Sequence, residues 1–231
     1  MGVSLVLTFR RGLWVGIGAV LLLFAGLVNQ QHRLRFLKWT LVTMLWGMMI
    51  LLPLLDQPQS RAVKLMHASF ERLGTLVNSN TFEANQTSTL RWRDFEYKHA
   101  LPQISSHPLL GLGFGAEYRP FVFGIDWEGF DGRRFTHNGH LWILLKSGLL
   151  GYLCFGWLSL SFLKRGFSSW RQVSNPLMRG TVLSFTLAYL AILLATITDP
   201  LVMQWQWIPV IGTMMGINEV ILARLHITDK T

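Results

Sequence analysis

Charged residues are scarce in this chain: they make up 14% of its 231 residues, whereas 51% are hydrophobic. A typical soluble domain carries about 25% charged residues. Several uncharged runs approach the roughly 20 apolar residues that a helix needs to cross a bilayer core about 30 Å thick. The shortage of charge therefore excludes an ordinary soluble domain. It predicts an all-α polytopic membrane protein, organised as a single membrane domain over residues 1–231.

Five stretches are apolar enough to be transmembrane helices. Three of them carry no charge, Leu141–Leu163 carries only Lys146, and Leu201–Leu222 carries only Glu219. An ionisable side chain is costly in lipid, so we expect Lys146 to face a cavity or another helix. The predicted transmembrane helices are residues 12–28, 39–55, 141–163, 180–198 and 201–222, and residues 56–139 form one long loop.

Cysteine is almost absent. The single Cys154 lies in an apolar run, so an intrachain disulfide is excluded and the redox compartment cannot be read from the sequence. We expect this thiol to pack against lipid or other helices, as a small apolar side chain does.

Patterns typical of metal sites are also missing. His137 and His140 are three residues apart, but no third ligand stands at a convincing spacing. The acidic residues Asp126, Glu128 and Asp131 follow no standard metal-loop pattern, and we interpret them as a solvated face of the loop. The sequence therefore predicts no metal ion.

The net charge of +9 is unevenly distributed along the chain. The loop 56–139 is neutral, with nine Lys/Arg and nine Asp/Glu, so it is not a basic face for nucleic acid. Nine other Lys/Arg lie in three short segments that five helices would place on one side of the membrane: 29–38, 164–179 and 223–231. The positive-inside rule makes that side cytoplasmic. The long loop, the Asp199-Pro200 turn and the Arg10-Arg11 pair are then expected on the periplasmic face.

The long loop has some helical character. Apolar residues at helical spacing over Arg61–Val77 predict an amphipathic helix at the membrane surface. Residues 78–86 are polar and are expected to form a turn region, whereas Thr89–Leu101 is again expected to be helical. The Gly111–Gly115 cluster is expected to be a turn, and residues 121–135 to be irregular. The loop is thus predicted to contain short amphipathic helices.

The cluster Gly111-Leu112-Gly113-Phe114-Gly115 is a candidate for binding phosphate through its backbone amides. A dinucleotide-binding fingerprint, however, needs a strand before the glycines and a helix after them. That context is missing here. A tight turn that returns the chain to the membrane is the alternative interpretation.

Two arginines are candidate anion-binding residues. A guanidinium group matches phosphate oxygens with a planar fork and stays charged at any working pH. Arg93 lies in the predicted loop helix. Arg11 lies at the start of the first predicted span, where a helix N-terminus adds positive potential. The alternative is interfacial snorkelling, with Asp94 and Glu96 as local salt partners of the loop arginines.

His137 is the best acid–base candidate, because histidine side chains can transfer protons near neutral pH. Asn138 beside it can orient a neighbouring group or donate a hydrogen bond. A structural or solvated loop histidine is the alternative interpretation. The predicted topology puts His137 on the same face as Arg11 and Arg93, so all three are candidates for one site.

The order and spacing of these motifs resemble the O-antigen ligase and O-antigen polymerase family. The resemblance rests on Pro108-Leu109-Leu110-Gly111-x-Gly113-Phe114-Gly115, then His137-Asn138-x-x-Leu141, then Gly148-Leu149-Leu150-Gly151. An Arg upstream of the Pro is usual in that family, and Arg93 occupies this position. Arg11-Gly12 before an apolar run is similar to the family's Ser-Arg-Gly helix start, with Arg10 in place of the Ser.

The resemblance implies a glycosyltransferase of the bacterial inner membrane that acts in polysaccharide or lipopolysaccharide biosynthesis. Its donor would be an undecaprenyl-diphosphate-linked glycan in membrane lipid, and its acceptor a glycan or lipid A–core. No nucleotide sugar, metal or other cofactor is implied. Arg93 and Arg11 would hold the diphosphate, and His137 would assist the acceptor hydroxyl. We expect a further set of residues to help bind substrate: Arg10, Arg91, Asn138, Gly111 and Gly113.

Members of that family usually have more helices than the five predicted, so we expect a short or N-terminally truncated member. Ligase and polymerase activities are both compatible with these motifs. A transporter or flippase component for lipid-linked glycan is an alternative, but it would need polar residues within its spans, and the predicted spans have few. An inactive truncated remnant of the family is the third possibility.

Overall fold

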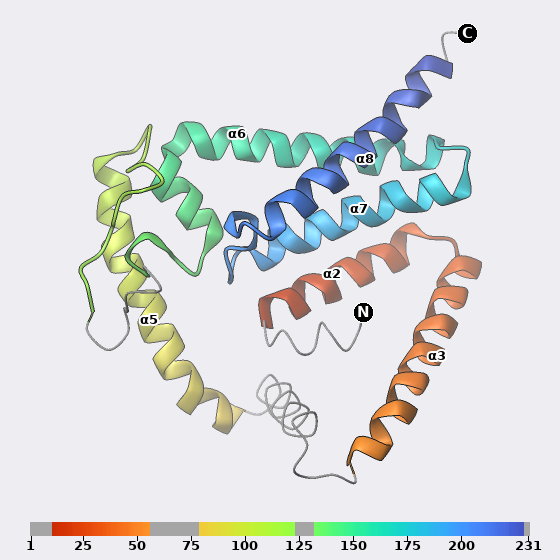
Figure 1. Ribbon diagram of the computed structural model, residues 1–231, viewed down its shortest axis with the longest axis horizontal. Helices are drawn as coiled ribbons and strands as arrows, with labels where there is room; N and C mark the ends of the chain where they lie inside the picture. Colours follow the sequence, from red (N-terminus) through yellow and green to blue (C-terminus); the bar gives the residue numbers. More distant parts are fainter. Residues whose placement is uncertain (1–10, 56–78, 123–131, 229–231) are drawn as a thin grey trace.

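The computed structural model describes residues 11–55, 79–122 and 132–228, and within these ranges the regular structure is entirely helical. The described α-helices are α2 (Arg11–Leu27), α3 (Gln30–Leu55), α5 (Ser79–Ser106), α6 (Gly139–Ser169), α7 (Pro176–Ala195) and α8 (Trp207–Thr228). Helices α2, α6, α7 and α8 form a bundle, and α3 and α5 leave it at opposite ends (Figure 1). The prediction of an all-α protein is confirmed.

Helix α7 lies at the centre of the bundle and contacts α2, α6 and α8. Asn175 caps its first turn by accepting hydrogen bonds from the backbone of Leu177 and Met178, and Pro176 occupies the first helical position. Helix α2 runs antiparallel to α7. A Cβ added at Gly16 would lie 2.8 Å from the carbonyl oxygen of Ala191, so only a glycine permits this close approach of the two helices.

The two ends of the bundle differ in their connections. At one end, Arg171 in the α6–α7 connection donates a hydrogen bond to the Leu27 carbonyl at the end of α2 (3.2 Å). Arg165 pairs with Glu219 in the second half of α8 (2.8 Å). The described parts of the three basic segments predicted to share one side of the membrane therefore lie at the same end of the bundle. The assignment of that end to the cytoplasm stays a prediction.

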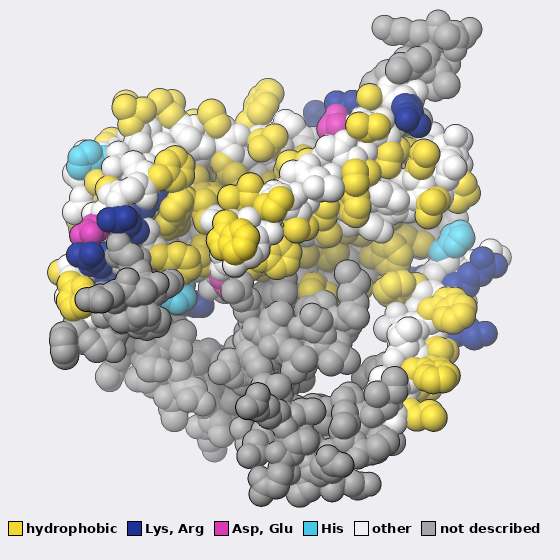
Figure 2. All heavy atoms as spheres, in the orientation of Figure 1, with side chains coloured by type: hydrophobic (Ala, Val, Ile, Leu, Met, Phe, Trp, Pro, Cys, Tyr) yellow, Lys and Arg dark blue, Asp and Glu magenta, His cyan; other side chains and the backbone are white. Residues whose placement is uncertain are grey.

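Two helical stretches of the described chain are long and apolar enough to cross a bilayer, Gly139–Gln172 and Pro176–Ala195. Gly16–Leu27 is a shorter apolar helix. Figure 2 shows apolar side chains over α6 and α8, with Lys and Arg toward the ends of this face. The exposed large apolar side chains of α6 include Leu149, Leu153, Trp157 and Leu160. The structure therefore supports a membrane protein with two candidate spans.

The remaining predicted spans coincide with helices of the structure. That these helices cross the membrane stays a prediction. Residues 39–55 lie within α3. The predicted span 201–222 begins differently from the expectation, because Leu201–Met203 forms a 3-10 turn and α8 starts only at Trp207. The Asp199-Pro200 turn before it is present as expected, with the Leu201 amide donating to the Asp199 carbonyl (2.7 Å).

The long loop is more helical than the sequence suggested. The prediction of a turn region at residues 78–86 was wrong, because α5 begins at Ser79 and continues to Ser106 through the predicted helix Thr89–Leu101. Residues 79–101, which precede Pro102 in α5, include neither glycine nor proline, so no strong helix breaker interrupts them. The predicted short helix is thus part of a 28-residue helix.

Other parts of the loop follow the expectation or lie outside the described residues. Gly111 and Gly113 adopt φ angles of 68° and 88° and form the predicted turn. Within the stretch predicted to be irregular, Gly132–Arg134 forms a 3-10 turn and residues 123–131 lie outside the described ranges. The predicted amphipathic helix Arg61–Val77 also lies outside them.

Small and polar side chains connect α6, α7 and α8. Gly166 lies directly against Thr186, where a larger residue would overlap the threonine side chain. Asn218 donates a hydrogen bond to the Thr186 hydroxyl (3.2 Å), and the Ser159 and Tyr189 hydroxyls share one of 2.7 Å. Close backbone approach and side-chain hydrogen bonds of this kind hold helices together in lipid, where the hydrophobic effect between helices is absent.

Helix α6 is sharply broken at Gly148, which has φ 64° and ψ −168° (Figure 1). In an unbroken helix, the carbonyls of Leu145 and Lys146 would accept from the amides of Leu149 and Leu150. These carbonyls instead accept from Leu112 and Gly113, each at 2.9 Å. The freed amides donate to the loop as well, to the carbonyls of Pro108 (2.8 Å) and Leu109 (3.2 Å).

The Pro108–Gly113 turn is therefore inserted into the break of α6 and satisfies both sides of it. A side chain at Gly111 would overlap the backbone of Lys146 and Gly148, so both glycines are required for this close contact. Lys146 itself is 1% exposed and donates to the Ala116 carbonyl. Its charged group thus lies against the loop and not in lipid, whereas a cavity or another helix was expected to receive it.

We predict that Gly148→Ala destabilises the protein because an L-residue is strained at positive φ and its Cβ would overlap the Leu109 backbone. The cost should be about 2 kcal/mol or more, lowering the melting temperature in detergent by roughly 4–8 °C. Gly156→Ala is the matched control on the same helix, since nothing lies within 4 Å of the added Cβ. Equal melting temperatures for the two variants would contradict this account of the break.

Candidate functional site

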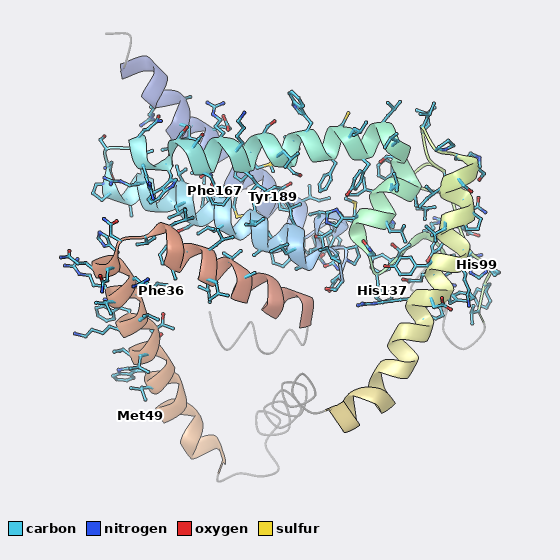
Figure 3. The ribbon with its side chains drawn as sticks, turned by 180° about the vertical axis from the view of Figure 1, so that it is seen from behind. Phe36, Met49, His99, His137, Phe167 and Tyr189 are labelled. Carbon is cyan, nitrogen blue, oxygen red and sulfur yellow. The ribbon has the colours of Figure 1, made fainter. Side chains whose placement is uncertain are left out.

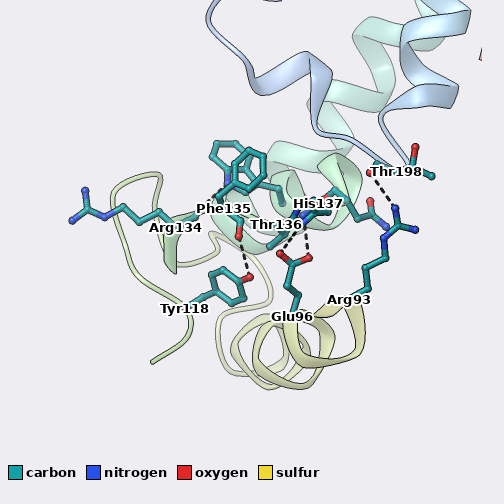
Figure 4. Close-up of polar contacts among 10 residues, drawn as sticks. Arg93, Glu96, Tyr118, Arg134, Phe135, Thr136, His137 and Thr198 are labelled. Carbon is teal, nitrogen blue, oxygen red and sulfur yellow. Dashed lines mark hydrogen bonds and ion pairs between the residues drawn. The ribbon is translucent and has the colours of Figure 1, made fainter. Parts of the chain in front are cut away.

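One face of α5 carries three polar side chains that reach two different parts of the chain. Arg93, Glu96 and Tyr97 are spaced three and four residues apart, so they lie on the same side of the helix. This face is turned toward the loop before α6 and toward the end of α7 (Figure 4). The packing of Ala100 against Leu145 and Tyr118 holds α5 in place there.

Glu96 and His137 form the closest polar contact of the site. Glu96 Oε1 lies 2.8 Å from the Nδ1 atom of His137, and its Oε2 accepts a hydrogen bond from the His137 backbone amide (3.1 Å). The Glu96 side chain is 5% exposed, whereas the His137 side chain is 47% exposed. No described residue hydrogen-bonds the Nε2 atom of this half-exposed ring, whereas its Nδ1 atom is held by a buried carboxylate.

Arg93 lies beside this pair. Its guanidinium donates a long hydrogen bond of 3.4 Å to the Thr198 carbonyl, just after the end of α7. No other described residue bonds this group, although a guanidinium carries five N–H donors. Figure 4 shows Arg93 and Glu96 side by side on α5, both directed toward the segments that meet there. The structure therefore brings together two of the three residues predicted to be catalytic, His137 and Arg93.

The third predicted residue, Arg11, begins α2 at the same end of the bundle. Its helix packs antiparallel on α7, so the start of α2 lies near the end of α7 that carries Thr198. The side chains of Arg11 and Arg91 are outside the described part of the chain, and so is all of Arg10. Figure 3 shows His137 at this end of the bundle, while Phe167 lies toward the other end.

Asn138 has a local structural role. Its side-chain oxygen accepts a hydrogen bond from the Leu141 amide (3.1 Å) and thereby caps α6. Its amide nitrogen donates to the Tyr97 hydroxyl (3.1 Å), and its carbonyl accepts from the Thr136 hydroxyl (2.8 Å). These bonds orient the residue next to His137. A contribution of Asn138 to substrate binding stays a prediction.

The glycines of the loop are engaged within the protein. The Gly111 amide donates to the His107 carbonyl (3.0 Å), and the Gly113 amide donates to the Lys146 carbonyl. Substrate binding by Gly111 and Gly113 therefore also stays a prediction. Of the two interpretations of this cluster, the structure supports the turn.

His140 is turned away from His137 and toward the bundle. Its Nε2 atom lies 3.2 Å from the Leu193 carbonyl, and its Nδ1 atom lies 3.4 Å from the Tyr152 hydroxyl. Among the described residues, no three His, Cys, Asp or Glu side chains cluster as metal ligands would. Asp126, Glu128 and Asp131 lie outside those residues.

Sequence reasoning missed Glu96 as a member of the site. It was considered only as a local salt partner for the loop arginines, whereas its partner is His137, 41 residues further along the chain. Asp94 does pair locally, but with Lys98 (2.6 Å). The available signal was the position of Glu96 one helical turn after Arg93, which places a carboxylate on the same face as the predicted functional arginine.

Comparison with known proteins identifies a family for this chain. The family model for O-antigen ligase matches residues 1–156, which include α5, the glycine turn, His137 and the break in α6. No curated protein and no solved structure matches the chain.

We predict that Asn138→Ala destabilises the protein by about 1 kcal/mol, the usual cost of removing a helix cap, and lowers its melting temperature by roughly 2–4 °C. Thermal unfolding of the purified variants in detergent measures this effect. Asn138→Asp retains a capping oxygen and should melt close to the wild type. If the alanine variant melts like the aspartate variant, the cap contributes nothing.

Proposed function

Because the chain belongs to the O-antigen ligase family, we propose that it transfers a glycan from undecaprenyl diphosphate to an acceptor on the periplasmic face of the inner membrane. The observation that carries this proposal is the His137–Glu96 pair beside Arg93. A half-exposed imidazole and a guanidinium group that lie at the same helix face suit a reaction that removes a proton and releases a diphosphate.

In the proposed reaction, the acceptor hydroxyl oxygen attacks the anomeric carbon of the donor glycan. The bond between that carbon and the diphosphate oxygen breaks, and undecaprenyl diphosphate leaves with the bonding electron pair. The hydroxyl proton passes to Nε2 of His137, which acts as the general base. The glycan is thereby joined to the acceptor oxygen.

Arg93 would bind the diphosphate through its N–H groups, since guanidinium forms bidentate, charge-assisted hydrogen bonds with phosphate oxygens. These bonds would strengthen as negative charge develops on the leaving group. Arg11 would add a second positive charge from the start of α2. Arg10 and Arg91 are proposed as further binding residues because the predicted topology puts them on the same face.

The position of the site is consistent with a lipid-linked donor. His137 lies at one end of α6, whose exposed apolar residues lie beyond the break at Gly148. An undecaprenyl chain could lie along such an apolar surface while its diphosphate stays at the polar end of the bundle. The acceptor, a glycan or lipid A–core, would approach from the aqueous side, where His137 is exposed.

We predict that His137→Ala and Arg93→Ala each abolish most glycan transfer. Removing a general base should lower the rate by about 10²–10⁴-fold, and removing a group that stabilises the developing charge by about 10²–10³-fold. The assay is transfer from undecaprenyl-diphosphate oligosaccharide by purified protein, with candidate glycan and lipid A–core acceptors compared. In cells, both variants should lose surface polysaccharide at a normal protein level.

Arg171→Ala is the control for the loss of one positive charge, because Arg171 lies at the opposite end of the bundle. It should retain transfer. Wild-type activity in both site variants would refute the assignment of His137 and Arg93. Wild-type protein that moves lipid-linked glycan across the bilayer without transferring it would instead favour the transporter alternative, and no activity on any acceptor would favour the inactive remnant.

A further inference from the structure

Glu96 is a buried carboxylate whose two oxygens are both committed to one residue. It is 4% exposed as a whole, and its hydrogen bonds go to the ring and to the backbone amide of His137. A carboxylate removed from water is costly unless it is paired and hydrogen-bonded. The pairing with His137 offsets this cost and orients the carboxylate from two directions.

The same geometry determines where the imidazole proton lies. An ionised carboxylate has only acceptor oxygens, so the ring nitrogen 2.8 Å from Oε1 must be the one that carries a proton. In the neutral ring, the other nitrogen is then an acceptor, since a neutral imidazole carries one N–H. For His137 that acceptor is Nε2, the nitrogen to which no described residue is bonded.

The surroundings hold this ring in one orientation. The backbone amide of His137 is tied to Glu96, and Phe135 meets the imidazole edge-on at a centroid distance of 5.8 Å. Asn138, the residue after His137, is held by its own hydrogen bonds to α5 and α6. The carboxylate thus acts on a ring whose position is already restricted by its neighbours.

We propose that Glu96 is a positioning residue that keeps His137 in the tautomer with its proton on Nδ1, so that Nε2 is available to accept the proton of the acceptor hydroxyl. This inference rests on the proposed role of His137 as the base. Carboxylates elsewhere set histidine tautomers in the same way, and their loss impairs function although they touch no substrate.

Glu96→Gln tests this role because it keeps the size of the side chain but adds an amide N–H₂, which can donate to Nδ1 and permit the other tautomer. We expect kcat for glycan transfer to fall about 10–100-fold, with little change in KM for the lipid-linked donor. Asp94→Asn is the matched control: it removes a carboxylate from the same helix, where the ion pair with Lys98 is largely exposed, and it should leave kcat unchanged.

Glu96→Asp separates charge from shape. It keeps a group with acceptor oxygens only but is one carbon shorter, so it should retain more activity than Glu96→Gln. If Glu96 serves only to pack α5 against the loop, the isosteric glutamine should instead be the better substitute. An equal loss of activity in both variants would also count against the tautomer role. The melting temperatures of both variants show whether either substitution destabilises the protein.

The tautomer itself can be observed by nitrogen NMR of protein with isotope-labelled histidine in lipid nanodiscs, with His137→Gln used to assign the signals. We expect a protonated Nδ1 and an unprotonated Nε2 at the pH of the activity assay, and a loss of this pattern in Glu96→Gln. A protonated Nε2 in the wild type would overturn the inference.

The two proposals fail in different ways. If His137→Gln keeps wild-type transfer, the proposed base is wrong, whatever the spectrum shows. If His137→Gln is inactive but Glu96→Gln keeps wild-type kcat, the base stands and the positioning role of Glu96 is overturned.

Discussion

The arrangement of the site depends on the break in α6 at Gly148. Breaking a helix leaves carbonyl and amide groups without partners, which is costly beside lipid because no water is available to bond them. The Pro108–Gly113 turn supplies four backbone hydrogen bonds that satisfy both sides of the break. This exchange joins the loop to the membrane helix without any side chain. It therefore constrains where the loop helix α5, which ends just before the turn, can lie.

From this constraint the site follows by short steps. Helix α5 is held against the first part of α6 by the turn and by the packing of Ala100 on Leu145. Its polar face then meets His137 and Asn138 immediately before α6. The Arg93–Thr198 bond adds the end of α7 to the same place. Three segments far apart in the sequence thus bring Arg93, Glu96 and His137 to one place.

The parts of this arrangement that the sequence predicted are those with a local signature. Apolar runs indicated most of the helices, and the glycine cluster indicated the turn. The functional roles of Arg93 and His137 stay predictions. The break at Gly148 was not anticipated, because a glycine within an apolar run is compatible with a continuous helix. Only the hydrogen bonds from the loop to the Leu145 and Lys146 carbonyls identify the break. The helical stretch from Ser79 was missed because its polar composition was interpreted as a turn, although nothing in it interrupts a helix.

Glu96 shows why the chemistry of the site was only partly predictable. Within its own helix, a carboxylate near arginines and lysines suggests an ordinary surface ion pair, and Asp94 forms one. Burial and a partner 41 residues away distinguish Glu96 from Asp94, and both properties arise only when α5 docks on the loop. Two carboxylates two residues apart on one helix thus receive different roles from tertiary packing alone.

The region matched by the family contains the candidate catalytic residues, but it does not contain everything that holds them. The Gly139 amide donates to the Thr196 carbonyl (2.8 Å), and a side chain at Gly139 would overlap Thr196 and Pro200. The first residue of α6 therefore packs against the segment that follows α7, and Arg93 donates a hydrogen bond to the Thr198 carbonyl in the same segment. Thr196–Pro200 follow α7 and lie beyond residue 156, so part of what holds the candidate catalytic residues is outside the matched region. A change that shifted the end of α7 would move the start of α6, and with it His137, relative to Arg93.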